Sequence, residues 1–405
     1  MDKKIFIFSF FVVTLLLSGC WDKVELNEIA IVSGITIEKG ENARYRVTVS
    51  AINSAEQSKT SMMGNTPSVN YSLEGDTVSE LTQKMNVGVS RKLIYSHTRV
   101  LVIDEAVARE GLLEFLDFLE RSGEFRNDFN ILIAREGEAQ DILKITYPIQ
   151  KDPSLKIHDQ AQSLHNEWGG DPGIRLTDFI TTLIIEGKHA VAAVVKVKGD
   201  PEKGSSVENN KKIDLDALIE FDGLAVFKFD KMIGTLSLEE ARSFIWTDDI
   251  EQTELSVPCN EEKNKFIDIK VISTSTKKET EYKNGKAKII VKLIGEADLM
   301  GTQCTDSLDK VDTFNKYEKL TETFIEGEIK DTINKTQEKY KVDIFGFGDT
   351  LNRSNHNEFK KIKYDWDQIF SEASVKVEAN IFLRRSGIRN KSFLTDLEKY
   401  KEKAE

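Results

Sequence analysis

Hydrophobic and polar positions along the first half of this chain predict strands that alternate with helices. Residues 44–52 (RYRVTVSAI) alternate well, with Tyr45, Val47, Val49 and Ala51 on one face, which is the period of a half-buried strand. Apolar runs predict further strands at 29–37, 98–103, 129–134 and 190–197. Helical spacing predicts helices at 105–121, 138–145, 155–168 and 176–186. This alternation predicts an α/β layer with a partly parallel sheet.

The second half of the chain is richer in strands. Alternating or apolar segments predict strands at 215–221, 223–229, 232–236, 266–274, 286–297 and 375–383. Asn284-Gly285 lies between two of them, and we expect a turn of more than two residues there. Helical spacing predicts a long helix over 308–340 and another over 359–369. The expected fold class is α+β, with two to three domains, mixed sheets packed with helices, and a β-rich second half that carries a long helix.

A polar stretch at 199–212 (GDPEKGSSVENNKK) separates the two halves. It has almost no apolar residue, so it predicts a linker or an exposed hairpin. The expected organisation is an N-terminal α/β region over 29–198, as one unit or two subdomains, a C-terminal α+β domain over 213–392, and a charged tail over 393–405. The polar loop at 54–68 is longer than most loops in compact domains and is a candidate contact surface.

The first 20 residues predict export and lipid attachment. Lys3 and Lys4 precede an apolar run over 5–17, and small residues then lead to Cys20. This is the layout of a secretory signal peptide over 1–19, and its apolar run is shorter than the roughly 20 residues that span a bilayer. The end, LSGC, resembles the bacterial lipobox. That resemblance implies cleavage between Gly19 and Cys20, a diacylglycerol on the Cys20 sulfur, and an acyl chain such as palmitate on the new amine.

Two other interpretations of this segment are an uncleaved membrane anchor and a plain secreted protein that carries a cysteine by chance. If the lipid is present, residues 20–28 form a short tether. Two or three acyl chains hold a protein durably on a membrane, because each buried CH₂ contributes about 0.8 kcal/mol.

The net charge limits the classes of partner that this chain can bind. The net charge is −12, which argues against nucleic acid as a partner because nucleic-acid binding needs a basic patch.

Apart from Cys20, the chain has only Cys259 and Cys304. In an oxidising compartment such a pair forms a disulfide or remains as two buried thiols, and the sequence leaves both open.

The chain contains almost no recognisable motif for catalysis, metal binding or cofactor binding. No HExxH, GxSxG or GxxxxGK motif occurs. His158 and His165 are seven residues apart, and we expect an exposed helix face there rather than a metal site. The glycines in Gly346-Phe347-Gly348-Asp349 predict a tight turn between two helices rather than a phosphate loop. The residues by themselves therefore give no support for an enzyme activity, a metal site or a cofactor, and we expect none of the three.

Several short motifs together resemble one family. The lipobox Cys20 is followed at once by Trp21-Asp22, then by Glu25-Leu26 and by 31–35 (IVSGI). Further matching segments occur in the same order along the chain: 91–99 (RKLIYSHTR), 222–227 (DGLAVF), 239–246 (EEARSFIW), 343–349 (DIFGFGD), 366–370 (WDQIF) and 384–387 (RRSG). This series resembles the Ger(x)C spore germination lipoproteins. One departure is Phe229, which stands where the family pattern leads us to expect a glycine.

The resemblance implies a non-enzymatic role. Ger(x)C proteins are the C subunits of nutrient germinant receptors, so it implies an α+β protein held by its lipid on the outer face of the spore inner membrane. It also implies assembly with integral membrane A and B subunits, and Cys20 is the site residue that it carries over. The alternative function is a solute-binding lipoprotein of a membrane transporter, although such proteins normally have two similar α/β lobes.

Overall fold

The computed structural model describes Glu25, residues 27–53, 65–262 and 264–385, and Leu397 and Tyr400. The predicted signal peptide, the cleavage site at Gly19 and the lipid site at Cys20 lie outside these residues. So do residues 54–64 of the predicted contact loop and almost all of the charged tail.

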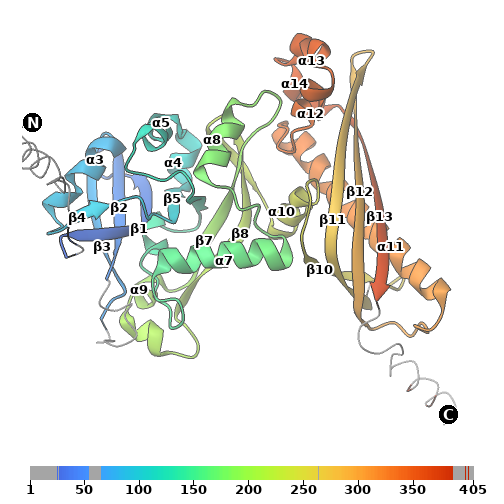
Figure 1. The fold of residues 1–405 in the computed structure, drawn as a ribbon, viewed down its shortest axis with the longest axis horizontal. Helices are drawn as coiled ribbons and strands as arrows, with labels where there is room; N and C mark the ends of the chain where they lie inside the picture. The colour runs from blue at the N-terminus through green and yellow to red at the C-terminus, as the bar shows by residue number, and fades with distance from the viewer. Residues whose placement is uncertain are drawn as a thin grey trace, which may run out of the picture.

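A mixed nine-stranded sheet forms the body of the first part of the molecule (Figure 1). The strands follow the order β3-β2-β1-β5-β6-β7-β8-β9, and β4 also pairs with β1. The centre is parallel, as predicted, and both margins are antiparallel. The strands are β1 (Ile29–Lys39), β2 (Tyr45–Ile52), β3 (Ser68–Gly75), β4 (Lys92–Ile94), β5 (Val100–Asp104), β6 (Asn130–Ala134), β7 (Val191–Gly199), β8 (Ala217–Lys228) and β9 (Lys231–Leu236).

Helices cover both faces of this sheet because its central strands are apolar on both sides. In β5, Val100 and Val102 face one core, while Leu101 and Ile103 face the other. One face packs on α3 (Val78–Lys84), α4 (Glu105–Glu110), α5 (Leu113–Arg121) and α8 (Leu176–Ile184). The other packs on α6 (Ala139–Ile142) and α7 (Pro153–Trp168).

The helix predicted over 105–121 is divided in two. Gly111 has φ +129°, a backbone conformation that favours glycine, and it ends α4. The backbone N–H of Leu112 then donates to the Asp230 carboxylate (3.0 Å) and to the Asp230 carbonyl (3.2 Å). A residue more than a hundred positions away therefore fixes the start of α5.

The stretch at 199–212 lies between β7 and β8, which are antiparallel neighbours. It contains two short helical segments, α9 (Pro201–Gly204) and η2 (Val207–Lys211). Asn209 is fully buried and donates to the carbonyls of Thr146 (2.9 Å) and Ala217 (3.2 Å), so this segment is packed on the domain and is not a free linker. The first sheet continues through β8 and β9, beyond the boundary expected at 199–212.

The second part of the molecule is a four-stranded sheet with helices packed on it (Figure 1). Its order is β10 (Thr253–Pro258), β11 (Phe266–Lys283), β12 (Lys286–Thr302) and β13 (Ser374–Arg385). Lys283 pairs with Lys286, so Asn284-Gly285 is a two-residue turn and the longer turn expected there is wrong. Both turn residues have positive φ, which suits the twist of a two-residue hairpin.

The long predicted helix is present as α11 (Val311–Lys335), continued by the π-helical turn η3 (Thr336–Tyr340). Three of its glutamates lie along the outer edge of β13, the last strand of the sheet. The carboxylate of Glu326 accepts the backbone N–H of Ala379 (3.0 Å). In the same way Glu322 accepts that of Ile381 (3.2 Å), and Glu318 accepts that of Leu383 (2.9 Å). This satisfies donors that an edge strand would otherwise offer to another chain.

Shorter helices complete the second part: α10 (Leu238–Ile245), α12 (Phe347–Ser354), α13 (His356–Ile362) and α14 (Trp366–Ser371). The single helix expected over 359–369 is therefore two helices, α13 and α14. Cys259 and Cys304 are joined in a disulfide, with Cα atoms 6.4 Å apart; Cys259 directly follows β10 and Cys304 lies just beyond β12, the two strands that flank β11.

Candidate functional site

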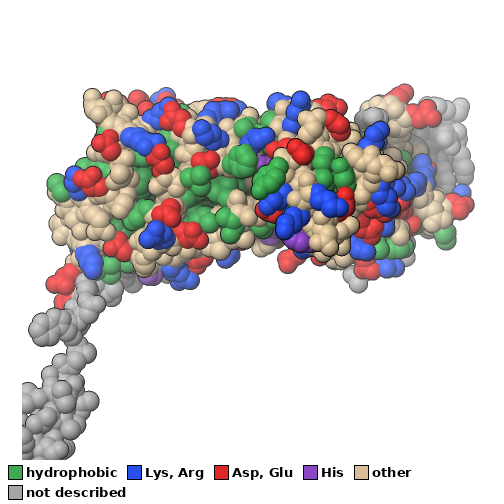
Figure 2. Space-filling model, turned by 90° about the horizontal axis from the view of Figure 1, so that it is seen from above, with side chains coloured by type: hydrophobic (Ala, Val, Ile, Leu, Met, Phe, Trp, Pro, Cys, Tyr) green, Lys and Arg blue, Asp and Glu red, His purple; other side chains and the backbone are tan. Residues whose placement is uncertain are grey.

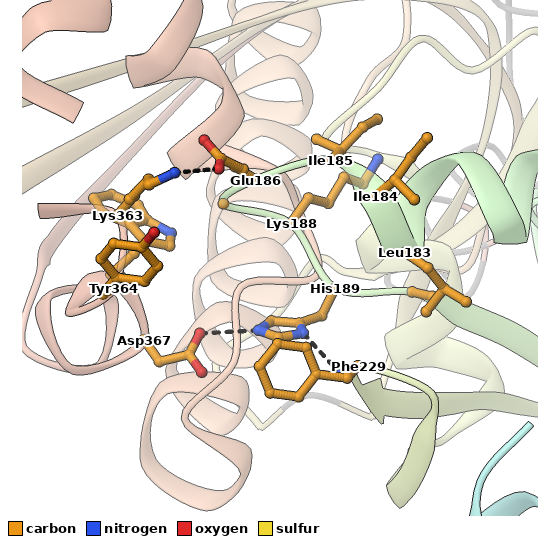
Figure 3. Close-up of a pocket in the computed structure, with 13 residues that line it drawn as sticks. Leu183, Ile184, Ile185, Glu186, Lys188, His189, Phe229, Lys363, Tyr364 and Asp367 are labelled. Atoms are coloured by element: carbon orange, nitrogen blue, oxygen red, sulfur yellow. Dashed lines mark hydrogen bonds and ion pairs between the residues drawn. The ribbon is translucent and has the colours of Figure 1, made fainter. Parts of the chain in front are cut away.

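A hollow of about 270 Å³ lies where the first sheet's domain meets the C-terminal helices (Figure 3). We call it the junction hollow. Three segments line it: the end of α8 with the loop that follows, the β8–β9 turn, and the segment from the end of α13 into α14. The side chains that the argument uses are Ile184, Glu186, Lys188, His189, Phe229, Lys363, Tyr364 and Asp367.

Two glycines bring the backbones of the two parts together below the hollow. A Cβ atom on Gly348, in the first turn of α12, would come within 2.7 Å of the Gly187 Cα and within 2.5 Å of the Trp366 Nε1. Gly187 itself has φ +81° and equally little room. Only glycine permits such an approach at both positions.

Asp343 organises the turn that leads into α12. It is fully buried, and its Oδ1 accepts the backbone N–H groups of Phe345 (3.0 Å) and Gly346 (2.9 Å). Its Oδ2 accepts the N–H of Gly348 (2.8 Å) and the indole Nε1–H of Trp366 (3.0 Å). Burial raises the pKa of Asp343 above its ordinary value, although these hydrogen bonds act in the opposite direction.

The same turn joins the two parts of the molecule directly. The backbone N–H of His189 donates to the carbonyl of Asp343 (2.7 Å), and that of Asp349 donates to the carbonyl of Gly187 (3.3 Å). Gly346, with φ +79°, starts α12, so the predicted turn at these glycines is present. The role predicted for the two glycines is only partly right. Gly346 forms the turn, whereas Gly348 permits close packing against Gly187.

Both ring nitrogens of His189 form hydrogen bonds at the junction hollow. Nδ1 accepts the backbone N–H of Phe229 (3.3 Å), so the proton is assigned to Nε2, which donates to Asp367 (2.9 Å). Lys228 pairs with the other Asp367 oxygen (2.8 Å). Burial disfavours the Asp367 carboxylate, but the His189 hydrogen bond and the Lys228 charge outweigh it and lower the pKa of Asp367.

Two lysines border the hollow in different environments. Lys363 pairs with Glu186 (2.5 Å) across the opening, as Figure 3 shows. Lys188 is largely buried, and burial followed by the nearby charge of Lys278 lowers its pKa. The ionisable side chains of the hollow are therefore mostly engaged with one another, and none of the described ones forms a nucleophile with a free general base.

The rim of the hollow is apolar and exposed. Ile184 is 78 % exposed, Phe229 66 % and Tyr364 89 %. Phe229 also has φ +54°, a left-handed conformation that costs a bulky residue on the order of 1 kcal/mol. Phe229, the residue that departs from the family pattern, therefore lies in a strained turn and exposes its ring. Figure 2 looks down on this side of the molecule and shows hydrophobic side chains gathered over its middle.

Three of the sequence motifs meet beside this junction. Residues 239–246 form α10, residues 343–349 form the turn into α12, and residues 366–370 form α14. Their aromatic rings make one chain of contacts, from Phe244 to Phe345 (5.7 Å), from Phe345 to Phe347 (5.4 Å) and from Phe347 to Phe370 (6.3 Å). Gly187, Lys188 and His189 belong to the same site, and no sequence pattern singled them out.

The other predicted residues lie elsewhere. Residues 222–227 are the middle of β8, where Asp222 pairs with Lys196 (2.7 Å) and Arg135 (3.4 Å). His158 and His165 lie on α7, away from the junction hollow. Within the described part of the chain, no group of His, Cys, Asp and Glu side chains could hold a metal ion. No helix among those residues has both the length and the apolar character to cross a membrane.

Comparison with known proteins covers nearly the whole chain. The family model "Spore germination protein N-terminal domain" matches residues 22–197, and "Spore germination B3/ GerAC like, C-terminal" matches 222–387. Spore germination protein KC of Bacillus subtilis (strain 168) is 32 % identical over 384 residues, which cover 93 % of this chain and 94 % of that protein. Spore germination protein B3 of the same organism is 24 % identical, with 91 % and 94 % covered.

A solved structure shares the fold. The crystal structure of the GerBC protein aligns with a TM-score of 0.52 at 19 % identity, and the match covers 86 % of this chain and 96 % of that one. The two family models also divide the chain between residues 197 and 222, whereas the two sheets divide later, after β9. The chain belongs to the GerAC-like family of spore germination proteins.

Proposed function

We propose that this chain is the lipid-anchored C subunit of a nutrient germinant receptor, needed for the assembly or signalling of the receptor that triggers spore germination. The observation that carries the proposal is the match to both family domains, which together extend over residues 22–387. The lipobox at Cys20 supports anchoring on the outer face of the spore inner membrane. Integral A and B subunits are the proposed partners.

The junction hollow supports a role in contact rather than catalysis. Its ionisable side chains pair mainly with one another, while its rim exposes Ile184, Phe229 and Tyr364. Backbone strain of this kind clusters at functional sites, where the surrounding structure holds the residue in place. The Phe229 ring is therefore the part of the rim that we assign to contact with another receptor subunit.

The alternative, a solute-binding lipoprotein of a transporter, has less support. That class has two similar lobes around a cleft, whereas the described residues form a nine-stranded and a four-stranded sheet of different topology. Calorimetric titration of the purified protein with amino acids and sugars separates the two functions. Tight, saturable binding would favour the transporter alternative.

The experiment that tests the proposal uses spores of a strain with a single receptor set. Cys20→Ala should release the protein from inner-membrane fractions and abolish dipicolinate release in response to the cognate nutrient. The same loss should follow from deletion of the whole chain. Normal germination of deletion spores would refute the receptor role, and firm membrane retention of Cys20→Ala would refute the lipid anchor.

A further inference from the structure

A second hollow, of about 340 Å³, opens beside α7 and has a different chemistry. We call it the α7 pocket. It lies between α7, the first residue of β6 and the segment 172–175. The side chains that line it are mostly polar: Asn130, His158, Gln162, His165, Asn166 and Arg175. The receptor role assigns no task to this pocket.

The lining contains hydrogen-bond donors and titratable rings but no carboxylate. That is unusual for this chain, in which 68 Asp and Glu outnumber 56 Lys and Arg. Two arginines give the pocket its positive charge. Arg175 lines it directly, and the charge of Arg99 acts on His158, which is one of the lining residues. Asn130 forms an isolated β-bridge with Arg175.

Both guanidinium groups lack an acidic partner within the described part of the chain, where most other arginines form ion pairs. Burial and then the charge of Arg99 lower the pKa of His158, and Arg175 acts in the same direction. Asp159 and Asp128 oppose this effect. Asp128 is paired with Arg126 (3.0 Å), and Asp159 accepts a hydrogen bond from Gln150 (3.0 Å).

Hydrogen bonds to neighbouring groups fix the orientation of the two histidine rings. Nδ1 of His165 lies 2.7 Å from the carbonyl of Asp171 and must donate to it, which leaves Nε2 without a described partner. Nδ1 of His158 lies 2.8 Å from the Asn130 side-chain oxygen, and its Nε2 is 3.3 Å from the Gln162 amide.

We propose that the α7 pocket binds a small anion that carries a phosphate or carboxylate group, with Arg175 as its principal charged contact. Arg99 adds positive potential, and the amides of Gln162 and Asn166 supply neutral donors. A planar guanidinium suits either kind of anion because it can donate two parallel hydrogen bonds. A metal cation is disfavoured here by the two unpaired arginines.

The test is calorimetric titration of the purified full chain with inorganic phosphate and, separately, with succinate, at pH 6. We expect saturable binding of at least one anion. Arg175→Gln should weaken binding at pH 6 at least tenfold, and Arg99→Gln/Arg175→Gln should abolish it. Arg353→Gln is the matched control, since Arg353 is an exposed arginine on α12 and should leave affinity unchanged.

A readout on the unmodified protein keeps the proposal testable if the variants do not fold. Imidazole NMR signals of His158 and His165 should shift on addition of the bound anion, while that of the exposed His356 stays in place. Absence of saturable binding for both anions at pH 6 would overturn the proposal. Binding that survives in the double variant, or that leaves both pocket histidines unshifted, would overturn it as well. None of these results depends on germination.

Discussion

Replacing Asp343 with alanine is the sharpest test of how the two parts of this protein are joined. The carboxylate is fully buried and accepts four hydrogen bonds, from three backbone N–H groups and from the Trp366 indole. Asp343→Ala removes the acceptor and leaves all four donors in a space that water does not reach. It also loosens the turn that presents the Asp343 carbonyl to His189 across the junction.

The expected loss of stability follows from those four donors. Each buried donor left unsatisfied costs about 1–3 kcal/mol. Part of that cost is returned, because the buried carboxylate is itself disfavoured, as the raised pKa of Asp343 indicates. We therefore expect a decrease in the free energy of unfolding on the order of 4 kcal/mol, a large share of the 5–15 kcal/mol typical of a domain.

The assay is urea unfolding of the purified chain, followed by tryptophan fluorescence and far-UV circular dichroism. Asp349→Ala is the matched control, since Asp349 is an acidic residue of the same turn that pairs with Arg353 at the surface (3.0 Å). Its loss should cost no more than about 1 kcal/mol. If Asp343→Ala also cost less than about 1 kcal/mol, the carboxylate would not be the anchor of this junction.

Three further predictions concern other parts of the fold. Burial raises the pKa of Asp171 from 3.8 to about 6, so the folded state holds a proton that the unfolded state loses, and stability falls as pH rises between these values. Asp171→Asn should remove that slope, which amounts to at most about 3 kcal/mol, and an unchanged pH profile of unfolding would contradict this. Cys304→Ser should lower the free energy of unfolding by about 4 kcal/mol, because the disulfide to Cys259 closes a loop of 45 residues; equal urea midpoints with and without reductant would refute it. Alanine at all three α11 glutamates should expose the β13 edge and cause self-association in light scattering, whereas Asp331→Ala on the same helix should not; the triple variant replaces Glu318, Glu322 and Glu326.

Local patterns predicted most of the elements but not their ends. Alternation identified β2, apolar runs identified the central strands, and helical spacing identified α7, α8 and α11. The errors occur where distant groups intervene. Asp230 caps the start of α5 from the β8–β9 turn, and Asn209 anchors a polar stretch that has the composition of a linker. The two-residue turn at Asn284-Gly285 was misjudged although its residues are the ones that such a turn prefers.

The candidate sites were less predictable than the fold. The 343–349 motif was recognised, yet its partner Gly187 and the ring of His189 come from a loop with no distinctive pattern. His158 and His165 were noticed as a pair, but the sequence could not show that Arg99 and Arg175 lie beside them. Lipidation of Cys20 stays a prediction, because that residue lies outside the described part of the chain.

The sequence by itself determined what depends on neighbouring residues: the periods of strands and helices, the export signal, and the ordered series of motifs that resembles one family. Tertiary structure alone decided which distant residues meet. The contact of Gly187 with Gly348, the donors around Asp343 and the charges around His158 join segments far apart in the chain. The physical reason is that periodicity reports which face of an element is buried, whereas the partner on that face is chosen by packing of the whole domain.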